Sequence, residues 1–337
     1  ANPYLIATTA HLIELSNSSG DWGSHFLQTA DLTFDATEGN VDWDGDGTVG
    51  DADDAAGFLP IGISGTNFAG SYDGGGKTIS NLFIDRSTIK LGLFRQLEGT
   101  GSVSGLGLLN VYISGAGGDN SQEYFGALAG ENRGGSIDRC YSTGYVEGPN
   151  SVGGLVGLNN GTITNSYSSC DVVDTPGGIY NGAAGLAAGN NGFITNCYSV
   201  GHVTGEANLG GLVINSNSNV THCFWDTQTS TQATSAGGTG KSTAEMKAYS
   251  TFAPDPDPMG VGWDFVSETA NGTADVWDMD QEGTVNNGYP ILSWQPGADL
   301  ITQKYGGGLG TEANPYLIAT TAHLIELSNS SGDWGSH

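Results

Sequence analysis

Hydrophobic positions in the middle of the chain recur at a nearly constant spacing. In each copy a leucine lies within a short Gly-rich segment, and an aromatic residue follows twelve or thirteen positions later. A β-branched residue lies four positions before each aromatic residue. The leucines are Leu128, Leu155, Leu186 and Leu212, the β-branched residues are Ile137, Ile163, Ile194 and Val220, and the aromatic residues are Tyr141, Tyr167, Tyr198 and Phe224.

These copies have the length and composition of β-helix coils. The aromatic residues are 26, 31 and 26 positions apart, and short β-prone runs are separated by Asn-Gly or Gly-Gly turns. One coil cannot bury its inner face alone, but coils stacked about 4.8 Å apart place like residues on like residues. The pattern predicts an all-β solenoid with interior aromatic and aliphatic ladders, and Asn159 and Asn190 fall at matched positions for an Asn ladder.

The flanks have different patterns, which predict small α/β caps. A strand at residues 4–6 precedes a helix over residues 9–15 that Thr8 or Thr9 caps. A further strand is expected over residues 58–63, and residues 242–245 have the form of a capping box. The predicted domains are an N-terminal cap with a calcium loop (1–90), the coils (91–226), a C-terminal cap (227–305), a Gly-rich linker (306–312) and the start of the next tandem unit (313–337).

The last of these boundaries follows from a duplication. Residues 313–337 repeat residues 1–25 without a single difference, at an offset of 312 positions. The duplication predicts a window from an array of near-identical units, with neighbouring copies as head-to-tail partners. The alternatives are a duplication introduced in cloning, or a fold that needs two similar edges.

The charge of the chain excludes some classes of partner. There are 36 acidic residues against nine Lys and Arg, which gives a net charge of −27. Nucleic acids and anionic membrane surfaces need clustered basic residues, so neither is expected as a partner. The charge favours divalent cations instead. No apolar run reaches the roughly 18 residues of a membrane span, so none is expected in this segment.

Two of the copies resemble a known sequence motif. Residues 153–168 and 185–199 look like the GLUG motif of bacterial surface proteins, and residues 2–6, 68–79 and 223–226 resemble the regions that usually surround it. The resemblance implies a right-handed parallel β-helix in a protein that is extracellular or on the cell surface. It also implies an adhesin, a surface-layer protein or sometimes a surface peptidase, in which the motif itself is not catalytic.

An acidic run near the N-terminus has the spacing of a calcium loop. Asp42, Asp44 and Asp46 occupy its first, third and fifth positions, Thr48 would offer its carbonyl oxygen at the seventh, and Asp53 is the twelfth. Gly47 at the sixth position suits the sharp turn. The run resembles a dockerin calcium loop, but only one loop is present, so docking to a cohesin is not expected. We expect calcium as a structural cofactor; the alternative is an acidic solvated turn.

The remaining candidate groups give weaker signals. Cys197 and Cys223 would stack on adjacent coils, as a disulfide or as buried thiols. Asp278, Asp280 and Glu282 are expected to form an acidic surface cluster. No CxxC pair, His cluster, Gly-x-Ser-x-Gly or His-Glu-x-x-His element occurs, so no catalytic residue is predicted.

The predicted function is therefore structural. The chain is expected to be a calcium-stabilised repeat unit of a long extracellular fibre or cell-surface stalk, and not an enzyme. An adhesin that binds a glycan or a host surface is the alternative. A carbohydrate-active β-helix enzyme is the third reading, but no coil carries a clustered acid pair with a basic neighbour.

Overall fold

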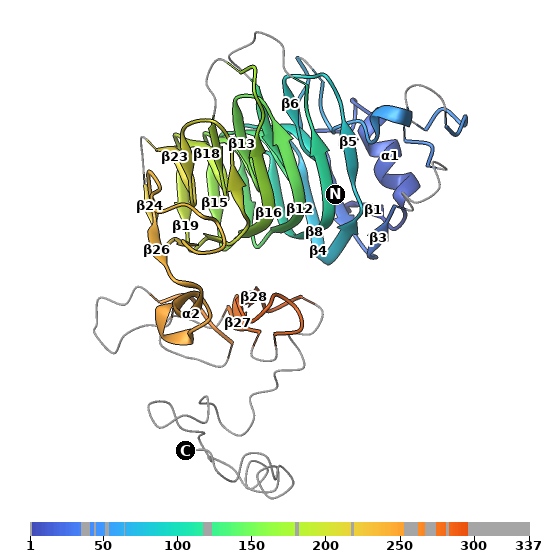
Figure 1. Cartoon of the computed structure of the whole chain (residues 1–337). Coiled ribbons are helices and arrows are strands. Elements are labelled where there is room, and N and C mark those ends of the chain that lie inside the picture. Colours follow the sequence, from blue (N-terminus) through green and yellow to red (C-terminus); the bar gives the residue numbers. More distant parts are fainter. Residues whose placement is uncertain are drawn as a thin grey trace, which may run out of the picture. The chain divides into compact units, whose positions relative to one another are not determined.

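The computed structural model describes residues 2–34, 41–43, 45–50, 54–63, 65–116, 123–178, 182–216, 219–252, 262–266, 274–280 and 283–295. The chain divides into two compact units, Ala1–Met246 and Lys247–His337. The first unit is a stack of parallel strands, drawn from blue to yellow in Figure 1, and the second is a small unit with one antiparallel strand pair.

Three parallel sheets build the first unit. The largest contains β1 (Tyr4–Ile6), β2 (His25–Gln28), β3 (Leu32–Thr33), β4 (Ser71–Ser80), β5 (Phe83–Asp85), β8 (Ser102–Ser114), β11 (Ser136–Asp138), β12 (Tyr141–Gly148), β15 (Thr162–Thr164), β16 (Tyr167–Asp174), β19 (Phe193–Thr195), β20 (Tyr198–Ser199), β21 (Val203–Thr204), β24 (Val220–Thr221), β25 (Phe224–Asp226) and β26 (Thr239–Lys241). The second contains β7 (Phe94–Glu98), β10 (Ala129–Arg133), β14 (Val156–Asn159), β18 (Ala187–Asn190) and β23 (Val213–Ser216). The third contains β6 (Lys90–Leu91), β9 (Tyr124–Gly126), β13 (Ser151–Gly153), β17 (Gly182–Ala184) and β22 (Leu209–Gly210).

Each coil passes through the three sheets in turn. The chain runs along β13, turns at Gly154 and Leu155, and continues along β14, β15 and β16 before the next coil begins. Leu155 points into the core and is fully buried. A Cβ atom at Gly154 would lie 2.2 Å from the Ser168 hydroxyl oxygen, so only glycine fits this corner. The all-β parallel solenoid predicted from the sequence is confirmed.

The predicted ladders occupy the interior. Ile137, Ile163, Ile194 and Val220 are in register on successive coils. So are Tyr141, Tyr167, Tyr198 and Phe224. The Tyr141 and Tyr167 rings stack with centroids 5.0 Å apart, and those of Tyr167 and Tyr198 are 4.8 Å apart. The repeated spacing therefore places identical side chains on one another, which buries them and aligns their rings.

A polar ladder runs beside the apolar ones. Asn132, Asn159 and Asn190 are in register, and each side-chain amide donates to the next side-chain oxygen at 2.8 Å. Asn190 in turn donates to the Ser216 hydroxyl at 3.4 Å. The ladder predicted at Asn159 and Asn190 is confirmed and extends by one residue in each direction. The ladder gives its buried side-chain N–H groups acceptors, while the side-chain oxygen of Asn132 at its end has no hydrogen-bond partner.

Local signals near the ends are mostly confirmed. Helix α1 (Thr9–Asn17) begins after Thr8, whose hydroxyl accepts the N–H of His11 at 3.2 Å. Helix α2 (Thr243–Met246) has the reciprocal capping-box bonds between Ser242 and Glu245. The strand expected over residues 58–63 is absent, and only single-residue bridges form there. Gly62 has a φ of +113°, which breaks the extended run.

The two ends of the stack differ. At the C-terminal end, residues 227–238 cover β22 and β23: the N–H of Gly211 bonds to the Thr234 carbonyl at 3.0 Å, and the N–H of Ala236 bonds to the Val213 carbonyl at 2.9 Å. At the N-terminal end, β1 pairs with β2 alone among the described residues. Tyr4 and Leu5 on β1 are 56% and 57% exposed.

The second unit has an aromatic core. The ring of Trp263 lies 4.6 Å from that of Phe252 and 4.4 Å from that of Trp277. Strands β27 (Trp277–Met279) and β28 (Pro290–Leu292) form an antiparallel pair. The short 3₁₀ helix η2 (Tyr249–Thr251) also belongs to this unit, while η1 (Asp54–Ala56) belongs to the first.

Candidate metal centre

The acidic run lies in the first unit between β3 and η1, next to helix α1. Trp43 anchors its start: the indole is buried and stacks on Phe34 with ring centroids 4.7 Å apart. Trp43 also lies 6.3 Å from the Phe83 ring. The loop is therefore held to the solenoid by an aromatic residue that the calcium pattern does not specify.

The first carboxylates of the run shape a tight turn. Asp42 accepts the N–H of Gly45 at 2.6 Å and the N–H of Gly47 at 2.9 Å, one on each oxygen. Asp46 accepts the N–H of Thr48 at 2.7 Å. Gly47 has a φ of +91°, so the sixth position adopts the left-handed conformation that the pattern requires. Asp44 and Asp53, the other two predicted ligands, lie outside the described residues.

A residue that the sequence pattern missed closes the loop. One oxygen of Asp54 accepts the N–H of Trp43 and the other accepts the N–H of Gly50, each at 2.6 Å. Asp54 is only 6% exposed, so these bonds satisfy a buried carboxylate. The Asp53-Asp54 pair was the only sequence signal for this role, and it does not tell which of the two faces inward.

The donor chemistry of the loop fits calcium. Calcium takes six to eight oxygen ligands, and carboxylate and carbonyl oxygens are its usual donors. Each Asp42 oxygen uses one of its lone pairs on a backbone N–H and keeps another for a cation. Within the described ranges, no three His, Cys, Asp or Glu side chains form a metal cluster. The calcium site stays a prediction.

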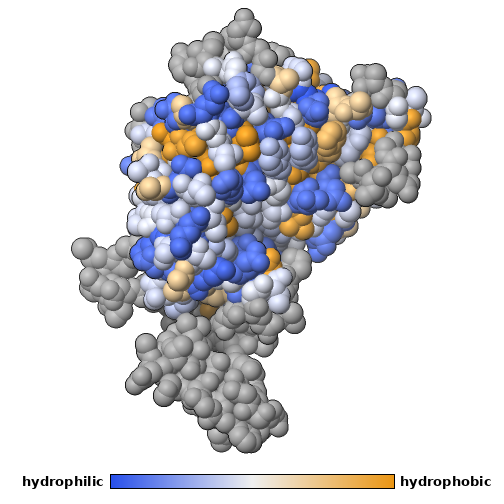
Figure 2. Space-filling view, in the orientation of Figure 1, coloured by the Kyte–Doolittle hydropathy of each residue, from blue (hydrophilic) through white to orange (hydrophobic). Residues whose placement is uncertain are grey.

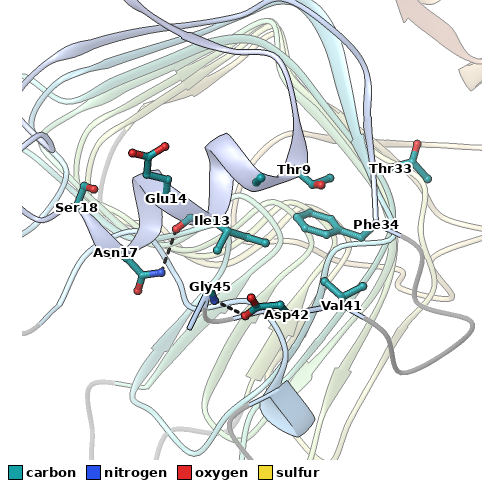
Figure 3. Close-up of a pocket in the computed structure, with 11 residues that line it drawn as sticks. Thr9, Ile13, Glu14, Asn17, Ser18, Thr33, Phe34, Val41, Asp42 and Gly45 are labelled. Carbon is teal, nitrogen blue, oxygen red and sulfur yellow. Dashed lines mark hydrogen bonds between the residues drawn. The ribbon is translucent and has the colours of Figure 1, made fainter. Parts of the chain in front are cut away.

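A cavity lies between helix α1 and the acidic loop, with a volume of about 630 Å³ (Figure 3). Glu14 and Asp42 give its lining two acidic groups, while Ile13, Phe34 and Val41 make part of it apolar. The other described lining residues are Thr9, Ala10, Asn17, Ser18, Thr33 and Gly45. The acidic loop therefore borders this space, although Gly45 packs closely on Ile13, where an added Cβ atom would lie 2.9 Å from Cγ2.

The second acidic cluster is not on the surface. Asp278 and Asp280 are both buried, which corrects the sequence-based expectation; Glu282 lies outside the described residues. Asp280 accepts the N–H groups of Thr284, Val285, Asn286 and Gly288 at 2.6–3.1 Å. Burial raises the pKa of Asp278 to about 6. Asp280 thus organises the loop before β28, which explains an acidic residue in this core.

The four cysteines are buried free thiols. Cys140, Ser166, Cys197 and Cys223 share one column, and each donates its hydrogen to the carbonyl two residues earlier. The Cys223 sulfur also accepts the N–H of Cys197 at 3.3 Å. Of the two alternatives left open by the sequence, the structure has the thiol ladder.

One buried ion pair was also missed by the sequence pattern. The Lys90 ammonium group contacts Glu131 and donates to the Gln96 side-chain oxygen at 2.7 Å. Glu131 also accepts from the Asn160 amide at 2.9 Å. Because Lys90 and Glu131 are 41 positions apart, only the stacking register brings them together. Their charges are satisfied by one another, which is typical of a structural pair.

The longest helix of the described residues, α1, has nine residues and is far too short to cross a membrane.

Comparison with known proteins confirms the motif. Residues 148–173 match the family model of the GLUG motif. They cover β13, β14 and β15, the corner between β13 and β14, and β16 without its last residue. The chain thus contains a GLUG motif within a parallel β-solenoid, as the sequence predicts.

Two relatives extend the comparison beyond the motif. The chain is 33% identical to Halomucin of Haloquadratum walsbyi over 368 aligned residues, which cover 96% of this chain and 4% of Halomucin. It is 35% identical over 136 residues to a protein of Evansella cellulosilytica that is named as a Gly-rich membrane protein, covering 40% of this chain and 14% of that protein. The chain therefore spans only a small part of the length of either relative.

A solved structure from Bacteroides ovatus, named as an immunoglobulin A1 protease, has a TM-score of 0.48 to this chain at 16% identity. The match covers 88% of this chain and 93% of that one. This likeness is too weak to assign an activity.

Proposed function

We propose that this chain is a structural repeat unit of a long extracellular fibre or cell-surface stalk. The observation that carries the proposal is the unbroken identity of residues 1–25 and 313–337. The first of these segments folds as β1 and α1 at one end of a parallel stack, so its second occurrence would mark the start of another solenoid. Repetition of such a unit from head to tail gives an extended molecule whose two ends differ.

The names of the relatives support an extracellular or cell-surface location. One is named Halomucin and the other a Gly-rich membrane protein, and both are much longer than this chain. The net charge of −27 favours solubility and repulsion between copies, which keeps a long chain extended. On the face seen in Figure 2, hydrophilic residues interrupt the hydrophobic ones, as expected of a surface that faces water.

Calcium is part of the proposal. Asp42, Asp44, Asp46 and Asp53, with the carbonyl oxygen of Thr48, would hold the ion. The bond from Gly47 to Asp42 and the turn at Gly47 support this assignment. The ion would neutralise an acidic loop that already lies against the solenoid through Trp43, and its role would be to stabilise this end of the unit.

A non-catalytic role is also proposed. Three buried charged side chains have structural partners: Lys90 contacts Glu131, and Asp54 and Asp280 accept backbone N–H groups. Groups held in this way are positioned for stability and are not presented to a substrate.

Electron microscopy of the native material tests the fibre. The expected result is a filament with one repeat per 312 residues, which loosens when a calcium chelator is added. Native material that runs as a single species near the mass of one unit, under controlled reducing and denaturing conditions, would contradict the proposal.

The metal site has a separate test. Tb³⁺ replaces calcium in oxygen sites, and Trp43 within the loop can sensitise its luminescence. Asp42→Asn is expected to weaken Tb³⁺ binding at least tenfold, whereas Asp85→Asn, at an exposed acidic position on β5, leaves it unchanged. Equal binding by the two variants would exclude this loop as the site.

Adhesion to a glycan is the second candidate, favoured by an aromatic row on the outer face. Tyr112 is 39% exposed and stacks between Phe83 and Tyr145, with ring centroids 5.5 and 5.6 Å away. Its hydroxyl donates to Glu147 at 3.2 Å. A glycan array that shows binding lost in Tyr112→Ala would support this role, and silence of the array with intact filaments would favour the structural one.

A further inference from the structure

The N-terminal edge of the solenoid leaves an interior column uncovered. Tyr4 on β1 stacks on Phe26 of β2 with ring centroids 5.5 Å apart. Phe26 is in register with Tyr72, and Tyr72 with Val103, from which the column continues to Ile137. Phe26, Tyr72, Val103 and Ile137 are at most 4% exposed, whereas Tyr4 is 56% exposed. The outermost member of an interior column is thus the only one of these left to water.

The same strand offers free backbone groups. Among the described residues β1 pairs with β2 alone, so its other edge has no strand neighbour. Leu5, the next residue, is 57% exposed. An unpaired strand with exposed apolar side chains is a template for another chain segment, and proteins usually cover or blunt such an edge. The edge of β1 carries neither a charged residue nor a proline within its three residues.

The opposite end of the solenoid is partly covered. Residues 227–238 cover β22 and β23, the edges of the two smaller sheets, with backbone bonds and with the Ser235 hydroxyl, which accepts the N–H of Val213 at 3.0 Å. β1 belongs to the largest sheet, whose other end is β26. The chain continues from β26 through α2 into the C-terminal unit, which is therefore the part of a preceding copy that lies nearest in sequence to the next β1.

We propose that the edge of β1 is the docking surface for the C-terminal unit of the preceding copy, residues 247–295. This inference rests on the tandem array proposed above. In such an array that unit precedes the next β1 and is joined to it by residues 296–315, which span at most about 70 Å when extended. A tether of this length keeps the local concentration high, on the order of millimolar.

The C-terminal unit has a reason to accept a strand. Among the described residues its sheet has two strands, β27 and β28. A parallel bridge from Phe265 to Trp277 occupies one edge of β27, so an added strand would pair with β28. A two-stranded sheet is marginally stable in water, and a third strand or a packed apolar surface stabilises it. Docking would cover Tyr4 and Leu5. At the same time it would add a strand to this small sheet or extend the apolar surface packed against it. It would also turn a tethered joint into a rigid one.

A tandem protein tests the contact. A complete second copy of residues 1–312 is joined after Glu312, which reproduces the natural junction. Leu5→Cys then probes the β1 edge without a preceding unit, and Leu317→Cys probes the same position behind one. The four natural cysteines do not interfere because all are buried.

Maleimide labelling of the folded tandem protein gives the readout. The cysteine at position 317 is expected to react at least tenfold more slowly than the cysteine at position 5. Phe193→Cys, at a residue 53% exposed on β19, serves as the control that reacts fast. Equal rates at positions 5 and 317, fast or slow, would overturn the proposal. If microscopy shows filaments but the two labelling rates are equal, the proposed array stands and only the docking contact is excluded.

Discussion

The ring of Tyr141 lies directly over Gly107. A Cβ atom added to Gly107 would be 2.5 Å from Cε1 of Tyr141, and the two residues are paired in register between β8 and β12. The aromatic column therefore ends on a glycine, whose bare backbone gives the last ring a flat surface. Toward the other end each ring packs on the next ring, so the column depends on every member.

Removing a ring from the middle of this column is expected to be costly. Tyr167→Ala deletes a fully buried ring that stacks on both Tyr141 and Tyr198, and should lower the free energy of unfolding by about 3–5 kcal/mol. Phe193→Ala, at an exposed position on β19, should change it by less than about 0.5 kcal/mol. Urea unfolding followed by circular dichroism measures both, and similar losses would contradict the interior role of the column.

The Asn ladder should behave as a connected network. Asn159→Ala leaves the amide of Asn132 and the side-chain oxygen of Asn190 without their shared partner. The Asn132 amide keeps its carbonyl acceptors and the Asn190 oxygen keeps the N–H of Gly192, so neither group is left without a partner. Each lost hydrogen bond costs about 0.5–1.5 kcal/mol, so a loss of about 1–3 kcal/mol is expected. Asn191→Ala breaks an exposed bond to Asn160 and should cost less than about 1 kcal/mol. Equal shifts of the urea midpoint in the two variants would show that the buried ladder contributes no more to stability than an exposed hydrogen bond.

The thiols should be inert until the protein unfolds. Burial raises the pKa of Cys140 to about 12 and that of Cys170 to about 11, and it also raises the pKa of Cys197, so almost no thiolate exists at pH 8. Iodoacetamide followed by intact-mass measurement should find no added groups on the native protein and four after denaturation. Fewer than four groups under non-reducing denaturation would reveal a disulfide.

A substitution in the same column provides a second check. Ser166 occupies the equivalent position in another coil and makes the same bond to a carbonyl two residues earlier, at 2.6 Å. Cys140→Ser should therefore fold and lose less than about 1.5 kcal/mol, because the hydroxyl can replace the thiol bond to the Asp138 carbonyl. Cys140→Val removes that bond and should lose more stability than Cys140→Ser in the same urea titration.

Stability is expected to fall as the pH rises from 4 to 7. Burial raises the pKa of Asp174 and that of Asp278 to about 6, from 3.8 for an exposed carboxyl. Between these pH values the folded state binds more protons than the unfolded state, so deprotonation favours unfolding. Urea midpoints at pH 5 and 7.5 test the direction. Asp174→Asn should flatten the pH dependence of the first unit, whereas the exposed Asp85→Asn should leave it unchanged.

The sequence predicts the parts of this fold that repeat. Ile137, Ile163 and Ile194 could be assigned to one column because a fixed period needs only like residues at like intervals. The Lys90–Glu131 pair could not be assigned, because it depends on the register between coils and has no repeat. The strand expected over residues 58–63 failed for a local reason, the positive φ of Gly62.

The same distinction holds for the candidate site: part of it could be predicted from the sequence and part could not. The turn around Asp42 and Gly47 could be read from spacing, since each position of a calcium loop has a fixed chemical demand. The role of Asp54 could not, because burial of a carboxylate depends on which N–H groups surround it. Asp280 is the same case in the second unit: an acidic residue is usually exposed, but four N–H groups of one loop make its burial favourable.

The unequal coil lengths have a consequence for how such a molecule can vary. Tyr167 and Tyr198 are 31 positions apart, against 26 on either side, yet Asp174 still pairs with Gly148 and Gly182 still pairs with Ser151. The additional residues all fall between Asp174 and Gly182, at a single corner. Additional residues can thus be inserted at this corner without changing the register of the core. Loops of new sequence can vary there while the ladders stay the same.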